Sequence, residues 1–294
     1  ICHCLVGSEM CIRDSIIGGS ADLAASTKQI ISDNTFGSNN FGGNSIEFGI
    51  REHAMGGIVN GLALHSNLIP YGSTFLVFSD YMRPSMRLAS LMNINSLFIF
   101  THDSIYLGED GPTHQPIEHL MSLRLIPNLD VIRPSNSMEL IHSYRYALEK
   151  RDNPKAIILS RQNMKFFDND VSYKDFQTGA YEFMPGSDIT LIATGSELEL
   201  AFEISTKLKD LSVQIISAPI LNRLNEERLE SLSLNQNIFT IELGRTIGWD
   251  TYIQNIKKSF SIDSFGESAP IDQLAEKFNF SAKKISDEIR SLLN

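Results

Sequence analysis

Cysteine, long apolar runs and excess positive charge are all scarce in this sequence of 294 residues. The three cysteines are Cys2, Cys4 and Cys11, and no second ligand pair at zinc spacing follows them, which argues against a zinc knuckle. No apolar run approaches the roughly 20 residues that a membrane span needs. The net charge of −10 argues against a nucleic-acid surface, because phosphate backbones require clustered lysine and arginine. We therefore expect a soluble cytoplasmic protein with no nucleic-acid or membrane partner.

The opening residues, ICHCLVGSEMCIRDS, differ in character from the rest of the chain. They lack the Arg-rich amphipathic form, or the charged-then-apolar form, of a targeting peptide. They resemble translated adapter sequence joined to a gene fragment. We expect residues 1–15 to be non-native or disordered.

From Ile16 onward, short β-branched runs alternate with longer amphipathic stretches, a pattern typical of α/β domains with mostly parallel sheets flanked by helices. The length suggests two such domains. We expect them at residues 16–167 and 187–294, with a polar linker at 168–186. The expected strands are listed here: 16–19, 45–49, 96–101, 129–134 and 156–160 in the first domain, and 188–196, 213–219 and 237–243 in the second, before a closing helix near 281–292.

A helix is predicted over residues 51–65, and it contains Gly56, Gly57 and Gly61. Glycine costs about 1 kcal/mol per helical position relative to alanine, so these glycines indicate close approach by another backbone. That approach fits either tight packing within one domain or a subunit interface.

The segment from Thr101 to Pro116 gathers two histidines, three acids, two glycines and two prolines after an apolar strand. In open α/β sheets the carboxyl ends of the strands form the ligand crevice. The segment is therefore interpreted as a substrate loop, with a solvated loop and a metal site as alternatives. A metal site lacks the support of a helical His-x-x-x-His pair or of cysteines.

Three further features allow both a structural and a functional interpretation. Glu52 lies at the start of a predicted helix, where its carboxylate either interacts favourably with the helix dipole or takes part in catalysis. Phe75, Phe78 and Tyr81 step by three and form either core or one side of a site for a flat ring. Arg161 directly follows an apolar strand, where its planar fork suits a phosphate or a structural ion pair.

Seven segments in this order resemble transketolase: GGSADLAAS, GIREHAM, STFLVFSDY, THDSIYLGEDGPTHQP, ILSRQN, ATGSELEL and FGESAP. The resemblance runs from about Ile16 to the C-terminus, and LGEDGPTHQP is its most specific part. Deoxyxylulose-phosphate synthase and the beta subunit of pyruvate dehydrogenase are similar in fold but lack the whole set. The resemblance implies the C-terminal half of a transketolase, a pyrimidine-binding domain followed by a C-terminal domain that contributes to dimer structure.

The resemblance also assigns a cofactor, thiamine diphosphate. Glu52 matches the glutamate that hydrogen-bonds the aminopyrimidine and favours its imino tautomer, which requires a carboxylate in a dry pocket. Phe75 matches the residue stacked on the pyrimidine, and Phe78 and Tyr81 complete the aromatic pocket. Asp22 matches an acid beside the cofactor across the subunit interface.

The substrates implied by the resemblance are sugar phosphates. Arg161, His102 and Ser26 match groups that bind the terminal phosphate. Asp110 and His114 match groups that contact the ketose hydroxyls, and His114 aids proton transfer. The implied reaction moves a two-carbon ketol unit from a ketose phosphate to an aldose phosphate, as in the pentose phosphate pathway and the Calvin cycle.

The sequence departs from the family pattern because it lacks the residues that bind the diphosphate of the cofactor. It has no Gly-Asp-Gly segment followed by Asn, the motif that binds Mg²⁺ and diphosphate on the N-terminal half of the family, and Ala25 replaces a common proline. We expect a diphosphate-binding N-terminal half as partner, within a homodimer of the complete enzyme. The chain is then a truncated fragment or a split subunit; a dihydroxyacetone synthase and a non-catalytic subunit are the alternatives.

Overall fold

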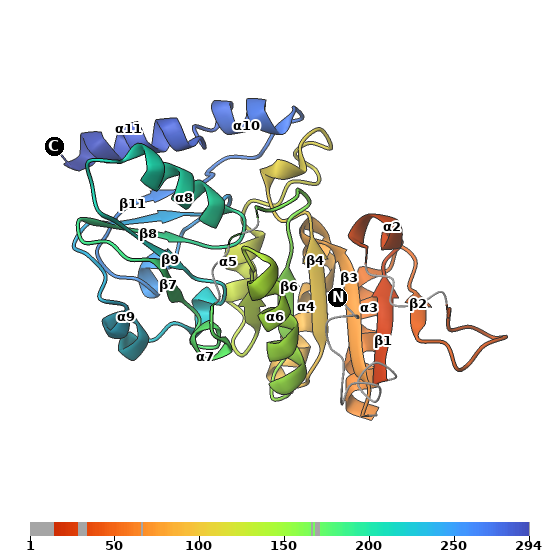
Figure 1. Ribbon diagram of the computed structural model, residues 1–294. Helices are drawn as coiled ribbons and strands as arrows, with labels where there is room; N and C mark the ends of the chain where they lie inside the picture. Colours follow the sequence, from red (N-terminus) through yellow and green to blue (C-terminus); the bar gives the residue numbers. More distant parts are fainter. Residues whose placement is uncertain (1–14, 29–33, 66, 166, 168–170, 294) are drawn as a thin grey trace.

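The computed structural model describes residues 15–28, 34–65, 67–165, 167 and 171–293. The expectation of a non-native start concerns residues of which all but Ser15 lie outside this range. The described chain forms two α/β units, each built on one sheet, which lie side by side (Figure 1). The predicted fold class is confirmed.

The first unit is a six-stranded sheet in which every neighbouring pair of strands is parallel. Its strands in spatial order are β2 (Ser45–Glu47), β1 (Ile16–Ser20), β3 (Ile69–Phe75), β4 (Leu97–Thr101), β6 (Lys155–Ile158) and β5 (Asp130–Ile132). Its helices are α2 (Ala24–Thr27), α3 (Glu52–His65), α4 (Ser79–Leu91), α5 (His119–Arg124) and α6 (Ser137–Glu149), with short 3₁₀ turns η1 (Leu76–Phe78) and η2 (Ile105–Leu107). Because the strands are parallel, their carboxyl ends meet at one edge.

The glycine-containing helix α3 packs closely on the rest of the first unit at only one of its glycines. A Cβ on Gly56 would lie 2.7 Å from the Cβ of Ser85 in α4, so this position allows the two helices to approach. A Cβ on Gly57 or on Gly61 would meet nothing within 4 Å among the described atoms. Tight packing within the domain therefore explains Gly56 and leaves the other two glycines on an open face.

The second unit is a five-stranded sheet, parallel except at one edge. Its strands in spatial order are β11 (Ile256–Phe260), β10 (Ile238–Ile241), β8 (Ile189–Ala193), β9 (Val213–Ser217) and the antiparallel β7 (Tyr181–Met184). The helical segments are α7 (Tyr173–Phe176), α8 (Glu197–Lys207), η3 (Leu221–Arg223), α9 (Glu226–Leu232), η4 (Trp249–Thr251), α10 (Ile271–Lys277) and α11 (Ala282–Leu293).

The segment expected as a linker at 168–186 contains α7 and β7. Ser172 caps α7 by accepting a hydrogen bond from the Asp175 amide, and β7 pairs with β9 as the edge of the second sheet. The second sheet therefore begins at Tyr181, before the boundary expected from the sequence. The polar residues that precede and follow β7 explain the difference, because they surround a strand of only four residues.

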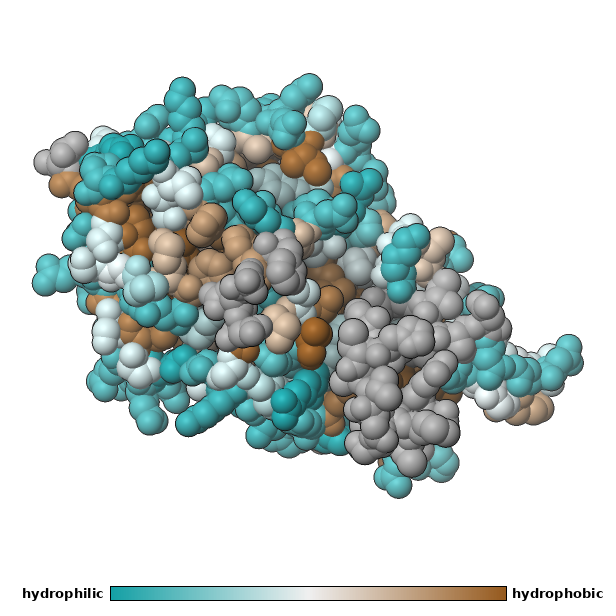
Figure 2. All heavy atoms as spheres, viewed as in Figure 1, coloured by the Kyte–Doolittle hydropathy of each residue, from teal (hydrophilic) through white to brown (hydrophobic). Residues whose placement is uncertain are grey.

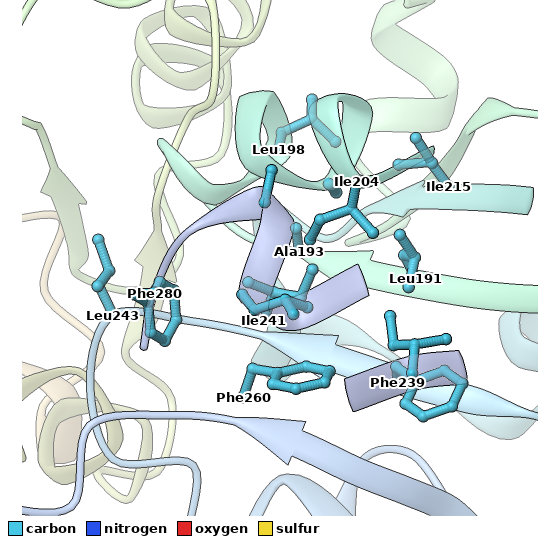
Figure 3. Packing of buried hydrophobic residues seen from close by; sticks show 14 of the residues in the cluster. Leu191, Ala193, Leu198, Ile204, Ile215, Phe239, Ile241, Leu243, Phe260 and Phe280 are labelled. Atoms are coloured by element: carbon cyan, nitrogen blue, oxygen red, sulfur yellow. The ribbon is translucent and has the colours of Figure 1, made fainter. Parts of the chain in front are cut away.

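Hydrophobic side chains cover both faces of each sheet. In the second unit, side chains from β8, β9, β10, β11 and α8 meet in a single layer (Figure 3). Phe239, Ile241 and Leu198 within it are fully buried. In the outer view, hydrophilic residues line the edge where α10 and α11 run (Figure 2). None of the helices in the described ranges is long and apolar enough to cross a membrane.

Candidate active site

The sequence-predicted site residues all follow the carboxyl end of a strand in the first sheet. Asp22 and Ser26 follow β1, and Glu52 follows β2. Phe75 is the last residue of β3, and Phe78 and Tyr81 come after it. His102, Asp110 and His114 follow β4, and Arg161 follows β6. These strands are neighbours in the order β2-β1-β3-β4-β6. One edge of one sheet therefore carries every one of these side chains.

The three aromatic residues after β3 form a ladder of rings. Because η1 is a 3₁₀ turn, side chains three residues apart lie over one another. The Phe75 and Phe78 rings are nearly parallel, with centroids 6.0 Å apart, and Tyr81 continues the series 6.2 Å from Phe78. Phe75 is buried, Phe78 is half-buried and Tyr81 is 63% exposed. Accessible ring surface is thus offered by Phe78 and Tyr81.

His102 lies against the buried end of this ladder. Its imidazole stacks on Phe75 with ring centroids 3.7 Å apart, and its Nδ1 pairs with Thr101 Oγ1 at 2.8 Å. Its backbone adopts a φ of 62°, a left-handed conformation that costs a residue with a side chain about 1–2 kcal/mol. Burial, and then the charge of Arg161, lower the pKa of His102 to about 4, so the ring is neutral at neutral pH.

Three other predicted substrate residues lie within electrostatic reach of His102. Arg161, Asp110 and His114 all act on its pKa through their charges, which places them near the imidazole. His114 also meets the Phe78 ring edge-on, with centroids 5.6 Å apart, and its Nδ1 pairs with Thr113. The structure thus brings four of the predicted substrate residues together beside the aromatic ladder.

Glu52, Asp22 and Ser26 are placed at the same edge, after the neighbouring strands β2 and β1. Glu52 is half-buried in the first turn of α3, where the helix dipole favours a carboxylate. Asp22 is exposed and has a φ of 61°, and Ser26 is exposed in α2. Among the described contacts, none is a hydrogen bond from these three side chains to the His102 group.

One residue that the sequence did not single out is Arg133, which directly follows β5. Its side chain is fully buried and donates to the Asp103 carboxylate at 2.8 and 3.0 Å. It also donates to Glu197 and to Thr194 of the second unit. Burial opposes its charge, but Glu197 and Asp103 outweigh burial and raise the pKa of Arg133 above its ordinary value. The sequence pattern that could have indicated Arg133 is an arginine directly after an apolar strand, which is the pattern that indicated Arg161.

A second buried ion pair continues this cluster. Arg124, at the end of α5, donates to both carboxylate oxygens of Glu242 at 2.7 and 2.8 Å. Glu242 also accepts from Thr194 Oγ1 at 2.6 Å and from the Trp249 indole. Charged residues of the two domains thus form ion pairs in a buried interface next to the segment 101–116.

Potential metal ligands in the described ranges meet at one place, outside the His102 group. One ligand atom each from Asp80, Glu118 and His119 lie within 4.8 Å of one another. His119 Nε2 is 3.2 Å from the Asp80 carboxylate, and both carboxylates are more than half exposed. This arrangement is a buried imidazole beside two exposed carboxylates.

Two family profiles divide the chain as the two sheets do. Residues 3–166 match the transketolase pyrimidine binding domain, and residues 179–281 match the transketolase-like TK C-terminal domain. The first match alone covers more than half of the chain.

The chain belongs to the transketolase family.

Curated transketolases match nearly the whole chain. The transketolase of Staphylococcus aureus (strain MW2) is 44% identical over 293 residues, and that of Halalkalibacterium halodurans is 40% identical over 291 residues. Each match covers 95% of this chain but 44% of the relative. The chain therefore spans less than half the length of these transketolases and corresponds to their C-terminal part.

Solved transketolases share the fold. The enzyme from Leishmania mexicana superposes with a TM-score of 0.89 at 34% identity, over 95% of this chain and 42% of that one. A structure described as a split gene transketolase, inactive beta4 tetramer, has a TM-score of 0.76 at 23% identity and is covered over 92% of its length. At that identity the second likeness concerns the fold alone.

Proposed function

We propose that this chain carries the pyrimidine side of a thiamine diphosphate site and, with a diphosphate-binding half, transfers a two-carbon ketol unit from a ketose phosphate to an aldose phosphate. The observation that carries the proposal is the gathering of Arg161, Asp110 and His114 around His102, beside accessible aromatic rings. Membership of the transketolase family supports the reaction class.

The side chains at this edge suit the flat aminopyrimidine of the cofactor. Phe78 and Tyr81 offer ring faces, whereas Phe75, the residue that the resemblance assigned to stacking on the pyrimidine, is covered by His102. Glu52 offers a half-buried carboxylate that would bind a ring nitrogen, and Asp22 an acid at the next strand end. When bound, thiamine diphosphate supplies the electron sink of the reaction. Its diphosphate and Mg²⁺ would be held by the partner half.

The His102 group would bind and orient the sugar phosphate. Arg161 supplies the charge and planar fork that suit a phosphate, with Ser26 as a further donor. Neutral His102 uses Nδ1 for Thr101 and offers Nε2 to a substrate oxygen. Asp110 would accept hydrogen bonds from ketose hydroxyls, and half-buried His114 would move a proton at a hydroxyl oxygen.

A partner half is part of the proposal, because the chain spans 44% of its curated relatives. The structure described as a split gene transketolase shares the fold of this chain, which covers 92% of its length. A complete cytoplasmic enzyme would then be a homodimer of paired halves.

The test mixes this chain with a separately expressed N-terminal transketolase half, thiamine diphosphate and Mg²⁺. Ketol transfer from xylulose 5-phosphate to ribose 5-phosphate is measured. We expect activity with both halves, and a loss of roughly 10²–10⁴-fold in Glu52→Gln, because glutamine keeps the shape but cannot share the proton.

The matched control is Glu227→Gln, which changes an exposed acid in the first turn of another helix, α9, and should leave activity unchanged. Absence of transfer, with both halves folded and associated, would overturn the proposal. Competition between formaldehyde and ribose 5-phosphate as acceptors separates a transketolase from a dihydroxyacetone synthase.

A further inference from the structure

Two motifs of the C-terminal domain, ATGSELEL at 193–200 and FGESAP at 265–270, have no part in the proposed chemistry. Both lie against the segment 101–116, called here the histidine loop, which carries His102, Asp110 and His114. Figure 1 shows this loop, in yellow after β4, reaching the start of α10 in blue.

The first motif holds the beginning of the histidine loop through Arg133. Arg133 donates two hydrogen bonds to Asp103, the residue after His102. The other side of its guanidinium is bound by Glu197 and by the Thr194 carbonyl and hydroxyl, at 3.0 and 2.9 Å. A Cβ on Gly195, whose φ is +54°, would lie 2.7 Å from Arg133 Nε. Only glycine allows the motif to pack this closely on the arginine.

The second motif holds the end of the loop through Gln115. The buried Gln115 amide donates to two carbonyls of the loop itself, those of Ile105 and Gly108, at 3.3 and 2.9 Å. It also donates to the Glu267 carbonyl of FGESAP at 2.9 Å, and a Cβ on Gly266 would lie 1.7 Å from Gln115 Oε1. Ser268 adds a hydrogen bond to the Glu109 carbonyl at 2.5 Å.

The loop needs such support at its functional end. The left-handed backbone of His102 is strained, and strain of about 1–3 kcal/mol persists only where the surroundings over-determine the conformation. Asp103 fixes the chain on one side of His102, and the sheet fixes it on the other. Asp110 and His114 lie in the part of the loop between the Arg133 and Gln115 attachments.

We propose that the C-terminal domain positions the histidine loop, with Arg133 and Gln115 as the positioning residues through which ATGSELEL and FGESAP place His102, Asp110 and His114. What the loop binds rests on the proposed function; its placement does not. This gives the domain a role at the site without any contact to substrate.

The experiment observes the imidazole of His102 directly by NMR of the chain with no cofactor or partner half. The signal is assigned by its loss in His102→Asn. In the native chain the ring stacked on Phe75 should show a ring-current shift and a pKa near 4. In Glu197→Ala we expect the ring-current shift to shrink and the pKa to rise toward 6.5, with an intermediate result in Glu197→Gln, which retains an acceptor for Arg133.

The control is Arg223→Gln, which breaks another interdomain ion pair, the one between Arg223 and Asp130 at 2.6 and 2.8 Å. Asp130 is the first residue of β5, so this ion pair lies at the amino ends of the strands, away from the carboxyl ends that carry His102. It should leave the His102 signal unchanged. An unchanged His102 signal in folded Glu197→Ala would overturn the proposal, and so would an equal change in Arg223→Gln, which would indicate general domain docking.

A second variant decides the matter if Glu197→Ala does not fold. Gly266→Ala displaces the Gln115 amide and should shift the His114 signal while both sheets stay intact by circular dichroism. An unchanged His114 signal would overturn the second attachment. In the reconstituted enzyme, the expected effect of either folded variant is a KM for the ketose phosphate raised about tenfold, with a smaller change in kcat. If that enzyme is inactive, the NMR result still stands, so the two proposals fail separately.

Discussion

Two regions at the carboxyl ends of the strands use their polar residues in opposite ways. In the open part of the first sheet's carboxyl edge, Asp22, Asp110 and Arg161 are exposed. At the second edge, Thr194 after β8 and Glu242 after β10 have no exposed surface, and both are hydrogen-bonded to arginines of the first domain or to each other. Polar groups follow the strand ends in both sheets. Exposed ones are available to a ligand, whereas buried ones form the joint between the domains, which consists of Arg124, Arg133, Asp103, Thr194, Glu197 and Glu242.

The joint where the first domain meets the second edge is sensitive because its charges, Arg133 among them, are buried. Removing one partner of a buried ion pair leaves an uncompensated charge, which costs far more than the pair itself contributes. Exposed charges at the first edge carry no such penalty, because water solvates whatever remains. Matched substitutions in the two regions therefore test the comparison.

The largest effect is expected for Arg133→Met. This change leaves Asp103 and Glu197 buried without their cation and should lower the free energy of unfolding by about 3–5 kcal/mol. Urea denaturation followed by circular dichroism measures it. A loss below about 1 kcal/mol would mean that water reaches the joint, and the contrast between the edges would be lost.

A smaller effect is expected from the pH dependence of stability due to His102. Its folded pKa of about 4 lies below the ordinary 6.5, so on acidification the unfolded chain takes up the proton first. The contribution of His102 is complete above pH 6.5 and is lost as the pH falls toward 4, by about 3 kcal/mol at most.

The measurement compares unfolding free energies at about pH 7 and about pH 4.5 in the native chain and in His102→Asn, by the linkage between proton uptake and stability. The native chain should lose more stability than the variant on acidification, since carboxylates titrate in both proteins. Equal losses would show that His102 is not held in its buried position.

The smallest effect on stability is expected for Arg161→Met, the exposed counterpart of Arg133→Met at the same edge of the first sheet. Arg161 is exposed, so the change should alter the free energy of unfolding by no more than about 0.5 kcal/mol. In the reconstituted enzyme it should weaken binding of the sugar phosphate. A stability loss as large as that of Arg133→Met would place Arg161 in a structural ion pair.

The fold was predictable where apolar runs are unbroken. Each of the expected strands is present, and helix α3 lies within one residue of its expected range. The central strand β3 was missed, although all seven of its residues are buried, because Pro70 and Gly72 interrupt its apolar pattern. A Cβ on Gly72 would lie 2.9 Å from Met55 Cγ, so packing of α3 requires the glycine. Tertiary packing here overrides strand propensity.

The site was predictable only as a set of residues, through the family resemblance. The assembly of Arg161, Asp110 and His114 around His102 depends on the order of β4 and β6 in the sheet. The joint escaped prediction because Arg133 and its partner Glu197 are 64 positions apart and neither position reveals the other. The individual roles of the predicted residues remain predictions.

The shared burial of Arg124 and Arg133 bears on how the chain can be divided. A cut after β6 would separate the two sheets, yet it would leave Arg124 and Arg133 on one piece and their partners Glu242 and Glu197 on the other. The boundary between the sheets is therefore crossed by buried ion pairs, and a cut there would expose the charges of both pieces to water.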